Sequence, residues 1–410
     1  MPLEKLKTVI AGRLSLLEKS GALKGAEPVI ARIKPASGKK GPRFILRGDK
    51  KEYIKMNSNS YLGLSLDRDV IKAEEETAAK FGAGPGSVRF INGTFKPHAE
   101  LEKKLSLFHG REAAILFSSA YAAVCGTVSS LISDETAVLS DALNHNSIIN
   151  AVKLSKPKEK KIYEHLNMNS MEIQIKGLKG RCRRVVIVSD GVFSMRGDYP
   201  DLKRMVSVAK EHNGGFEEGI ITVIDDSHGI GAYGKTGRGT CEVTGEYGID
   251  AVLSTLGKSL GVNGGYAVSD AKIIEYLRES APFYIYSNPI TPAEAGAAIK
   301  SLAILNSGRG RKMLSSLKET ADYFREGLVE TGYEIIKGIH PVVPLMLRET
   351  GKTIKLVAYL KEKGILATGL KYPVVPRGDE CIRFQVNFSH TRHDIDYVLN
   401  VLAEYKKSSV

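Results

Sequence analysis

Three short apolar runs place the strongest constraint on the fold of this chain. Each is rich in Val and Ile, ends in small or polar residues, and is followed by helical or loop-like sequence: RRVVIVSD (183–190), IITVIDD (220–226) and DAVLSTLGK (250–258). Such runs are typical of strands buried on both faces of a parallel sheet. ETAVLSDALNH (135–145) is a fourth candidate. We therefore predict an α/β fold with a mainly parallel sheet.

The sequence changes character after about residue 291. Amphipathic helical patterns and shorter strand-like pieces follow, and a chain of 410 residues is long enough for more than one core. We predict three parts, namely an N-terminal arm over residues 1–58, a large domain over residues 59–291 and a smaller α+β C-terminal domain over residues 292–410.

Composition excludes several classes of protein. Apolar residues make up 42% of the chain and charged residues 26%, which rules out global disorder. No stretch approaches the roughly 20 apolar residues of a membrane span, and the N-terminus lacks the pattern of a secretory signal. We expect a cytoplasmic protein with no membrane span. A zinc site or disulfide framework is not expected, because no CxxC spacing joins the four cysteines, Cys125, Cys182, Cys241 and Cys381.

The net charge is +13, from 59 Lys and Arg against 46 Asp and Glu. A basic surface favours anionic partners such as phosphorylated small molecules. We do not expect nucleic acid as a partner, because the basic residues are scattered along the chain and Trp is absent.

Lys258 follows the third apolar run and lies among small residues in TLGKSLG. A lysine beside a buried strand end is poorly solvated, which lowers its pKa and favours the neutral amine. A neutral amine is what Schiff-base chemistry requires. A surface lysine is the ordinary alternative at such a position.

Asp225 and His228 follow the second run in VIDDSHGIG. A carboxylate and an imidazole at a strand end suit a metal, a general base or a heteroaromatic cofactor. Metal is the weakest of these, because no further ligands lie at compact spacing. Asp226 points to the opposite face of the strand and is expected to be a turn or supporting residue.

Two glycine-rich stretches are not nucleotide-binding motifs. Residues 229–234 spell GxGxxG, but DDSH separates them from the strand and no helix follows directly. GAGPGSVRFINGT (82–94) lacks the GK[ST] ending of a P-loop. FSSAYAAVCG (117–126) places small and hydroxyl residues before a helical run, which suits either phosphate binding or an ordinary Ser cap.

Two further residues carry weaker signals. His145 lies near a strand end in DALNHNSII, where a packed or capping histidine is the commoner case. Arg383 interrupts an apolar strand in CIRFQVNF, and a buried arginine normally meets a carboxylate. A lysine, an aspartate, an imidazole, a phosphate loop and this arginine together describe a pyridoxal 5′-phosphate site, where Lys forms the Schiff base and the acid pairs with the ring nitrogen.

The sequence also resembles the α-oxoamine synthases, pyridoxal-phosphate enzymes of fold type I. The resemblance runs from about residue 59 to residue 391, in the segments NSYLGLS, SVRFINGTFKPHAELE, DALNHNSII, DGVFSMRGD, IDDSHGIGAYGKTGRG, TLGKSLG, YSNPITP, YPVVPRG and IRFQVNFSHT. It implies a large domain with a mainly parallel sheet, a smaller C-terminal domain and a homodimer with shared active sites.

The resemblance also implies a role for each matched residue. Lys258 would hold the cofactor and then remove the α-proton of an amino acid, and Asp225 would pair with the ring nitrogen. His145 would stack on the ring and polarise the thioester. His228 and Ser194 would donate hydrogen bonds to the phenolic oxygen. Asn59 and Arg383 would bind the substrate carboxylate. The phosphate would be bound by Ala120, Tyr121, Thr255 and the neighbouring subunit's counterparts of Ser287 and Asn288.

Within the family, the motifs are most similar to the glycine C-acetyltransferase branch (2-amino-3-ketobutyrate CoA ligases), which implies glycine and acetyl-CoA as substrates. The alternative is a synthase that uses another amino acid or a longer acyl thioester and decarboxylates the product, like 8-amino-7-oxononanoate synthase or serine palmitoyltransferase. An aminotransferase or lyase without an acyl acceptor, and a non-catalytic subunit, are further alternatives. Departures from the usual pattern occur at Ala120, Val124, Asn146, Arg196, Asn387 and Phe388.

Overall fold

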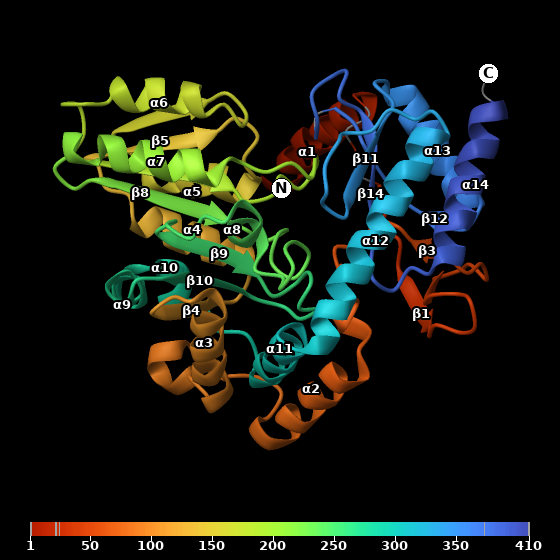
Figure 1. The fold of residues 1–410 in the computed structure, drawn as a ribbon, viewed down its shortest axis with the longest axis horizontal. Coiled ribbons are helices and arrows are strands. Elements are labelled where there is room, and N and C mark those ends of the chain that lie inside the picture. Colours follow the sequence, from red (N-terminus) through yellow and green to blue (C-terminus); the bar gives the residue numbers. More distant parts are fainter. Residues whose placement is uncertain (1, 21–22, 24, 373, 409–410) are drawn as a thin grey trace.

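A seven-stranded sheet forms the centre of the molecule, in the order β4-β10-β9-β8-β7-β5-β6 (Figure 1). The computed structural model describes residues 2–20, 23, 25–372 and 374–408. The four predicted strands are present as β5, β7, β8 and β9, and the mainly parallel α/β fold is confirmed. The strands are β4 (Ala113–Phe117), β5 (Thr136–Asp141), β6 (Glu159–Tyr163), β7 (Arg184–Asp190), β8 (Ile220–Asp225), β9 (Ala251–Thr255) and β10 (Gly265–Ser269).

Strand β10 runs antiparallel to both of its neighbours, β4 and β9. Its short segment GYAVS was not among the strands predicted from the sequence. An antiparallel strand needs only a short connection, so β10 follows β9 after the loop at 256–264 without a crossover helix. This loop carries Lys258.

Helices cover both faces of the sheet, because successive strand residues point to opposite sides. Val186 and Val188 pack in one apolar cluster with the helices α4 and α5, whereas Val185 and Ile187 belong to a second cluster with α3, α6 and α7. The helices of these layers are α2 (Arg68–Phe81), α3 (Lys96–His109), α4 (Ala120–Ser130), α5 (Asn146–Ser155), α6 (Met168–Lys176), α7 (Leu202–His212), α8 (Gly239–Thr244), α9 (Ala271–Ser280), α10 (Pro282–Ile285) and α11 (Pro292–Leu305).

A smaller antiparallel sheet, in the order β11-β14-β13, lies in the C-terminal part. Its strands and helices are β11 (Val342–Met346), β13 (Thr368–Leu370), β14 (Cys381–Gln385), α12 (Gly308–Glu330), α13 (Thr350–Glu362) and α14 (Arg392–Ser408). The N-terminal segment contributes to this part, since β3 (Ile54–Lys55) pairs with β12 (Ile365–Leu366). The domain limits at 58 and 291 stay predictions, and α11, which begins at Pro292, packs against α2 and α3.

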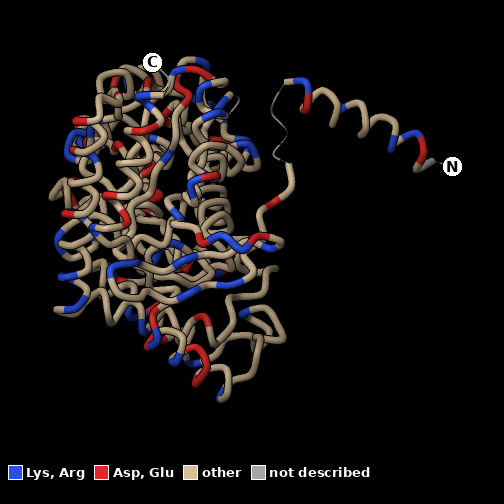
Figure 2. Tube along the Cα trace, turned by 90° about the vertical axis from the view of Figure 1, so that its right-hand side faces the viewer, with Lys and Arg blue, Asp and Glu red and all other residues tan. Residues whose placement is uncertain are grey.

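The first helix, α1 (Pro2–Lys19), stands away from the rest of the chain (Figure 2). It is followed by an antiparallel pair formed by β1 (Ile30–Lys34) and β2 (Arg43–Leu46). Lys and Arg are spread over many elements rather than gathered on one (Figure 2). Among the described residues, no helix is long and apolar enough to cross a membrane.

Candidate active site

The carboxyl ends of several parallel strands meet at one edge of the central sheet. β4, β5, β7, β8 and β9 all point toward this edge. Ligand sites of open α/β sheets form outside these ends. The residues that follow the strands there include most of the predicted site, namely Ala120, Tyr121, His145, Ser194, Asp225, His228, Thr255 and Lys258.

Lys258 lies in the loop after β9 and is half-buried. Loss of hydration lowers the pKa of its amine to about 8, and the charges of Asp225 and Asp190 only partly oppose this effect. A substantial fraction of the side chain is therefore the neutral amine near physiological pH. This agrees with the solvation argument made from the sequence.

Asp225 ends β8, opposite Asp190 at the end of β7. Both carboxyl groups are buried, and Oδ1 of Asp225 accepts a hydrogen bond from the backbone N–H of Ser227 at 3.1 Å. Burial and the charge of Asp225 raise the pKa of Asp190 well above its usual range. Two buried carboxyl groups this close do not both ionise readily, which favours the protonated form of Asp190.

His145 and His228 are both neutral in this environment. Burial lowers the pKa of His145, and burial and the charge of Lys258 lower that of His228 much further. His145 is the N-terminal cap of α5, and its backbone N–H donates to Asp190 Oδ2 at 2.8 Å. His228 Nδ1 shares a hydrogen bond of 2.7 Å with the hydroxyl of Tyr61. The His145 ring is held by the Ser147 hydroxyl, 2.7 Å from Nδ1, and the His228 ring by Tyr61.

The N-terminus of α4 forms an anion-binding cradle. The Ser119 side chain caps the helix by accepting from the N–H of Ala122, and among the described residues nothing accepts from the N–H of Ala120 or Tyr121. These free N–H groups point out of an 11-residue helix and suit a phosphate. Gly265 of β10 lets the cradle sit close, because a Cβ there would lie 2.4 Å from the backbone nitrogen of Ala120.

Thr255 and Ser287 lie beside this helix start. The Thr255 hydroxyl accepts from the N–H of Gly257 at 2.9 Å and so shapes the turn that leads to Lys258. The Ser287 hydroxyl donates to Ser118 Oγ of the same chain at 3.3 Å, and Asn288 is exposed. The resemblance placed these two residues at the neighbouring subunit's phosphate, which stays a prediction.

Arg383 reaches the site from β14 of the small sheet. It is 9% exposed, its Nη2 donates to Asn59 Oδ1 at 3.4 Å, and its Nε has no partner among the described residues. An unpaired donor on a buried guanidinium is costly unless a ligand accepts from it. Arg383 and Asn59, which the resemblance assigned to the substrate carboxylate, lie in contact, and the free Nε is suited to a carboxylate.

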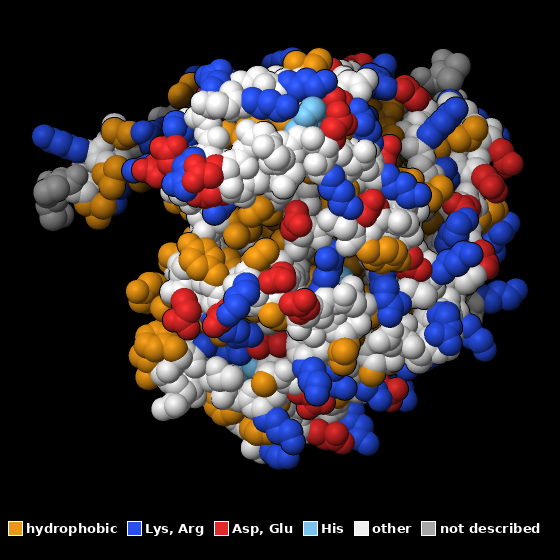
Figure 3. Space-filling model, turned by 60° about the vertical axis from the view of Figure 1, so that its left-hand side comes forward, with side chains coloured by type: hydrophobic (Ala, Val, Ile, Leu, Met, Phe, Trp, Pro, Cys, Tyr) orange, Lys and Arg blue, Asp and Glu red, His pale blue; other side chains and the backbone are white. Residues whose placement is uncertain are grey.

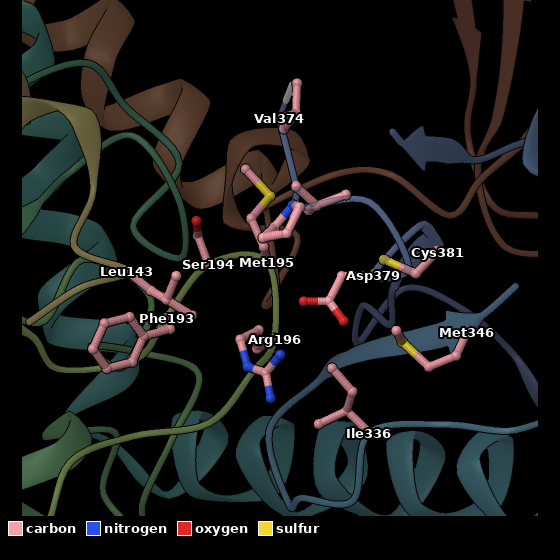
Figure 4. A pocket seen from close by; sticks show the side chains of 12 residues that line it. Leu143, Phe193, Ser194, Met195, Arg196, Ile336, Met346, Val374, Asp379 and Cys381 are labelled. Atoms are coloured by element: carbon pink, nitrogen blue, oxygen red, sulfur yellow. The ribbon is translucent and has the colours of Figure 1, made fainter. Parts of the chain in front are cut away.

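Ser194 lines a cavity of about 100 Å³ beside the site (Figure 4). The cavity is too small for a whole cofactor or substrate, so it is a side pocket for part of one. Its walls are mainly apolar, with Arg196 and Asp379 as the charged members. They comprise Leu143, Phe193, Ser194, Met195, Arg196, Ile336, Met346, Val374, Val375, Pro376, Asp379 and Cys381. In the YPVVPRG motif, Pro373 lies outside the described residues.

The departures noted in the sequence have different structural settings. Arg196 lies in the cavity wall, whereas Phe388 lines a separate surface groove with Leu66 and Met313. Val124 is packed in the apolar cluster of α4, and Asn387 binds the backbone oxygens of Ser58 and Gln385. Asn146 receives a hydrogen bond from the Tyr121 hydroxyl. Arg196 thus adds a positive charge to the wall of the cavity beside Ser194.

Asp226 and the GxGxxG stretch have the structural roles expected for them. The fully buried Asp226 carboxylate accepts from the N–H and the hydroxyl of Thr240, both at 2.7 Å, and pins the glycine-rich loop after β8. Gly231 and Gly234 in that loop have positive φ angles of 70° and 87°. A loop folded in this way provides no helix start for a dinucleotide.

Three supporting residues were missed from the sequence. Tyr61 lies in the quoted NSYLGLS segment and binds His228, and His340 Nε2 lies 2.9 Å from the backbone oxygen of His228. Asp190 ends an apolar run, and the strand-end rule applied to Asp225 would have found it. His340 had no local signal, because its contact spans 112 residues of sequence.

The geometry therefore defines a pyridoxal-phosphate enzyme of fold type I. It provides an amine of low pKa, a buried carboxyl group, a helix N-terminus with free backbone N–H groups and a buried arginine, all at the edge of a mainly parallel sheet. These are the groups that the cofactor's aldehyde, ring nitrogen and phosphate and a substrate carboxylate need.

Comparisons with known proteins agree. The family described as aminotransferase class I and II matches residues 51–402. The 8-amino-7-oxononanoate synthase of Petrotoga mobilis is 36% identical, covering 87% of this chain and 89% of its own length. The mitochondrial 2-amino-3-ketobutyrate coenzyme A ligase of Bos taurus is 35% identical, covering 98% and 92%. A serine palmitoyltransferase structure with pyridoxal phosphate has a TM-score of 0.88 and 29% identity, covering 99% and 98%.

The chain belongs to the aminotransferase class I and II family and, within it, to the α-oxoamine synthases. It is a pyridoxal-phosphate-dependent acyltransferase that condenses an amino acid with an acyl-CoA. Seven similar curated proteins are named 8-amino-7-oxononanoate synthase, one of them as putative, against one 2-amino-3-ketobutyrate coenzyme A ligase, so these relatives favour the alternative branch over the glycine C-acetyltransferase branch.

Proposed function

We propose that this chain joins alanine to an acyl thioester longer than acetyl and releases carbon dioxide and the thiol. The chemistry follows from the product in the relatives' name. In 8-amino-7-oxononanoate, carbons 8 and 9 with the amine are alanine without its carboxylate, and carbons 1 to 7 are a diacid acyl group. The side cavity beside Ser194 carries the proposal, because acetyl-CoA has no chain to fill an apolar pocket.

Lys258 is the residue proposed to bind the cofactor, with Asp225 at its ring nitrogen. When bound, pyridoxal phosphate accepts the electron pair that the α-carbon of the amino acid keeps when its proton leaves. Asp225 lies opposite Asp190, whose own protonated form is favoured by burial and by the charge of Asp225. The N–H groups of Ala120 and Tyr121 at the N-terminus of α4, with Thr255, would hold the cofactor's phosphate.

The proton and the substrates are handled by residues around this centre. Lys258 Nζ accepts the α-proton, since its low pKa leaves the amine free to do so. Arg383 and Asn59 would bind the amino-acid carboxylate, His228 and Ser194 would bind the phenolic oxygen of the cofactor, and His145 would stack on its ring. His145 also donates to the thioester carbonyl while the α-carbon attacks it and the thiol leaves.

Glycine with acetyl-CoA is the second candidate pair. It is favoured by the Bos taurus relative, which covers 98% of the chain, and by the motifs quoted from the sequence. The product would be 2-amino-3-oxobutyrate, with CoA released and no carbon dioxide. The two candidates differ in the acyl chain and in the fate of the carboxylate, so one set of assays separates them.

The test is CoA release by the cofactor-loaded protein over a grid of amino acids and acyl-CoAs. Glycine, alanine and serine are paired with acetyl-, heptanedioyl- and palmitoyl-CoA, and Lys258→Ala serves as the blank. We expect release with alanine and heptanedioyl-CoA, together with carbon dioxide, and a loss of at least about a hundredfold in Lys258→Ala. Release with glycine and acetyl-CoA alone would favour the second candidate. No lysine-dependent release with any pair would contradict both.

We also propose that the protein is a homodimer. α1 carries a stripe of exposed apolar side chains, and hydrophobic side chains also gather on the body beside the projecting helix (Figure 3). An apolar stripe without a partner in its own chain is typical of an interface. The stripe consists of Leu3, Leu6, Ile10, Leu14 and Leu17. A dimer would also bring Ser287 and Asn288 of one chain within reach of the partner's site.

A further inference from the structure

Two loops form one wall of the side cavity. The first follows β5 and contributes Leu143, just before His145. The second follows β7 and contributes the segment 193–196, which includes Ser194 and Arg196 (Figure 4). Neither loop belongs to a helix or strand, so contacts outside the main sheet ladder must hold this wall in place.

His165 bridges the bases of these loops from the segment after β6. Its Nδ1 lies 2.9 Å from Asp141 Oδ1, and its Nε2 lies 3.3 Å from Asp198 Oδ2. Asp141 ends β5 at the base of the first loop, and Asp198 closes the second loop. The ring also packs edge-on against Phe193, with 4.4 Å between the ring centroids. His165 does not line the cavity.

Asp141 holds more than one segment through this bridge. Its Oδ1 accepts from the N–H of Leu143 at 2.8 Å, and its Oδ2 accepts from the N–H of Leu166 at 2.9 Å. Leu166 has a φ of 56°, a left-handed conformation that is unfavourable for leucine. The backbone is therefore strained at Leu166, where His165 and the N–H of Leu166 both contact the Asp141 carboxylate.

Asp198 ties the second loop into a tight turn. Its backbone oxygen accepts from the N–H of Phe193 at 2.9 Å, and the Phe193 oxygen accepts from the N–H of Gly197 at 2.8 Å. The Asp198 side chain also accepts from Arg196 Nε at 2.7 Å. One carboxylate therefore orients both Arg196 in the pocket wall and His165 behind it.

The bridge is charged at physiological pH. Burial by itself disfavours the charged ring, but the hydrogen bonds and charges of Asp141 and Asp198 outweigh it and raise the pKa of His165 to about 9. Arg196 faces Asp198 from the other side, and the Tyr163 hydroxyl and the Asp190 carboxyl group are further titratable groups near Asp141. A pKa near 9 leaves the imidazolium intact through neutral pH.

We infer that His165 is a positioning residue for the acyl side of the reaction, a charged clamp between Asp141 and Asp198 that keeps both loops in the shape that admits the acyl group. The inference rests on the proposed function, because it takes the side cavity as the place of the acyl chain. Its expected signature is selective. Losing the clamp impairs use of the thioester more than cofactor binding, since Lys258, Asp225 and the α4 cradle make no contact with His165 and only His145 and Ser194 of the proposed cofactor contacts lie in the two loops.

The test compares His165→Gln with His393→Gln, an exposed histidine at the start of α14 that serves as the matched control. We expect His165→Gln to raise the KM for the acyl-CoA at least tenfold at pH 7.5, and to weaken pyridoxal-phosphate affinity by a smaller factor, because only His145 and Ser194 of the proposed cofactor contacts lie in the two loops. The unchanged protein and His393→Gln should show the same rise in KM between pH 8 and pH 10, and His165→Gln should show none. An unchanged KM in His165→Gln would overturn the inference.

A second measurement needs no turnover and no substrate. Amide hydrogen exchange is followed over residues 142–145 and 191–198 in the same three proteins, loaded with pyridoxal phosphate. We expect exchange at least tenfold faster in both loops of His165→Gln, and no change in His393→Gln. If the unchanged protein releases CoA with no substrate pair, the proposed function fails while this comparison still decides the clamp. Equal exchange in all three proteins would contradict the clamp.

If His165→Gln does not fold, the pH profile of the unchanged protein decides between the outcomes. A KM for the acyl-CoA that stays constant up to pH 10 would then overturn the inference.

Discussion

At the scale of single residues, the chemistry depends on how far the fold moves a side chain from its properties in water. Lys258, Asp190 and His228 differ from ordinary residues of their kind because burial makes their charged forms unfavourable. The same burial has the opposite outcome at His165, where two carboxylates stabilise the charge. The neighbours of each group therefore determine whether burial neutralises or preserves its charge.

The pKa of Lys258 predicts how the cofactor-free protein takes up pyridoxal phosphate. Only the neutral amine attacks the aldehyde, and the pKa is lowered to about 8, so the fraction able to react rises with pH through that value and levels off above it. The rate of the absorbance change on mixing should rise with a midpoint near pH 8. A midpoint near 10.5, the value of a fully hydrated lysine, would show that the fold does not activate this residue.

At the scale of elements, the site depends on the close approach of α4 to β10. Gly265 makes this possible, because a side chain at that position meets the backbone of Ala120 and Ser119. The antiparallel strand β10 thus sets the position of a helix N-terminus that we propose for the phosphate. Neither the apolar pattern of the sequence nor its helix signals predicted that β10 and α4 lie in contact.

Gly265→Ala should therefore weaken both folding and cofactor binding. The added methyl group would lie 2.4 Å from the Ala120 nitrogen, so α4 must shift, at a cost of about 1–3 kcal/mol in the free energy of unfolding. We expect a lower Tm and at least a tenfold loss in pyridoxal-phosphate affinity, measured by cofactor fluorescence. Gly214→Ala is the control, since no atom lies within 4 Å of its added methyl group. Equal cofactor affinity in the two variants would rule out a role for this close packing.

At the scale of the whole molecule, the exposed stripe of α1 predicts the assembly. Ile10→Glu places a charge in the middle of the stripe, and burying an unpaired carboxylate against a partner is unfavourable. We expect the variant to raise the dimer dissociation constant at least tenfold in analytical ultracentrifugation. Leu16→Glu is the matched control, because Leu16 is 67% exposed but lies about a third of a turn from the stripe at roughly 100° per residue. Identical dissociation constants for Ile10→Glu and Leu16→Glu would count against an interface on this face.

Much of the fold and the chemistry was predictable from local sequence. The apolar runs specified β7, β8 and β9, because a strand buried on both faces must be apolar along its whole length. The polar residues that end these runs specified where Asp225 and Lys258 lie, since parallel strands bring their carboxyl ends to one edge. Strand β10 and the helix α13 were not predicted, as short or weakly patterned segments are assigned by their partners rather than by their own residues.

Contacts between distant segments lay beyond the reach of local sequence. Arg383 meets Asn59 across 324 residues, His340 meets His228 across 112, and His165 joins two loops that belong to different strands. The charge state of a buried residue depends on such neighbours. Local sequence does not show which residues those neighbours are. The residues able to do the chemistry were thus visible in the sequence, whereas their protonation, the side cavity and the clamp behind it arise only where packing brings separate segments together and excludes water.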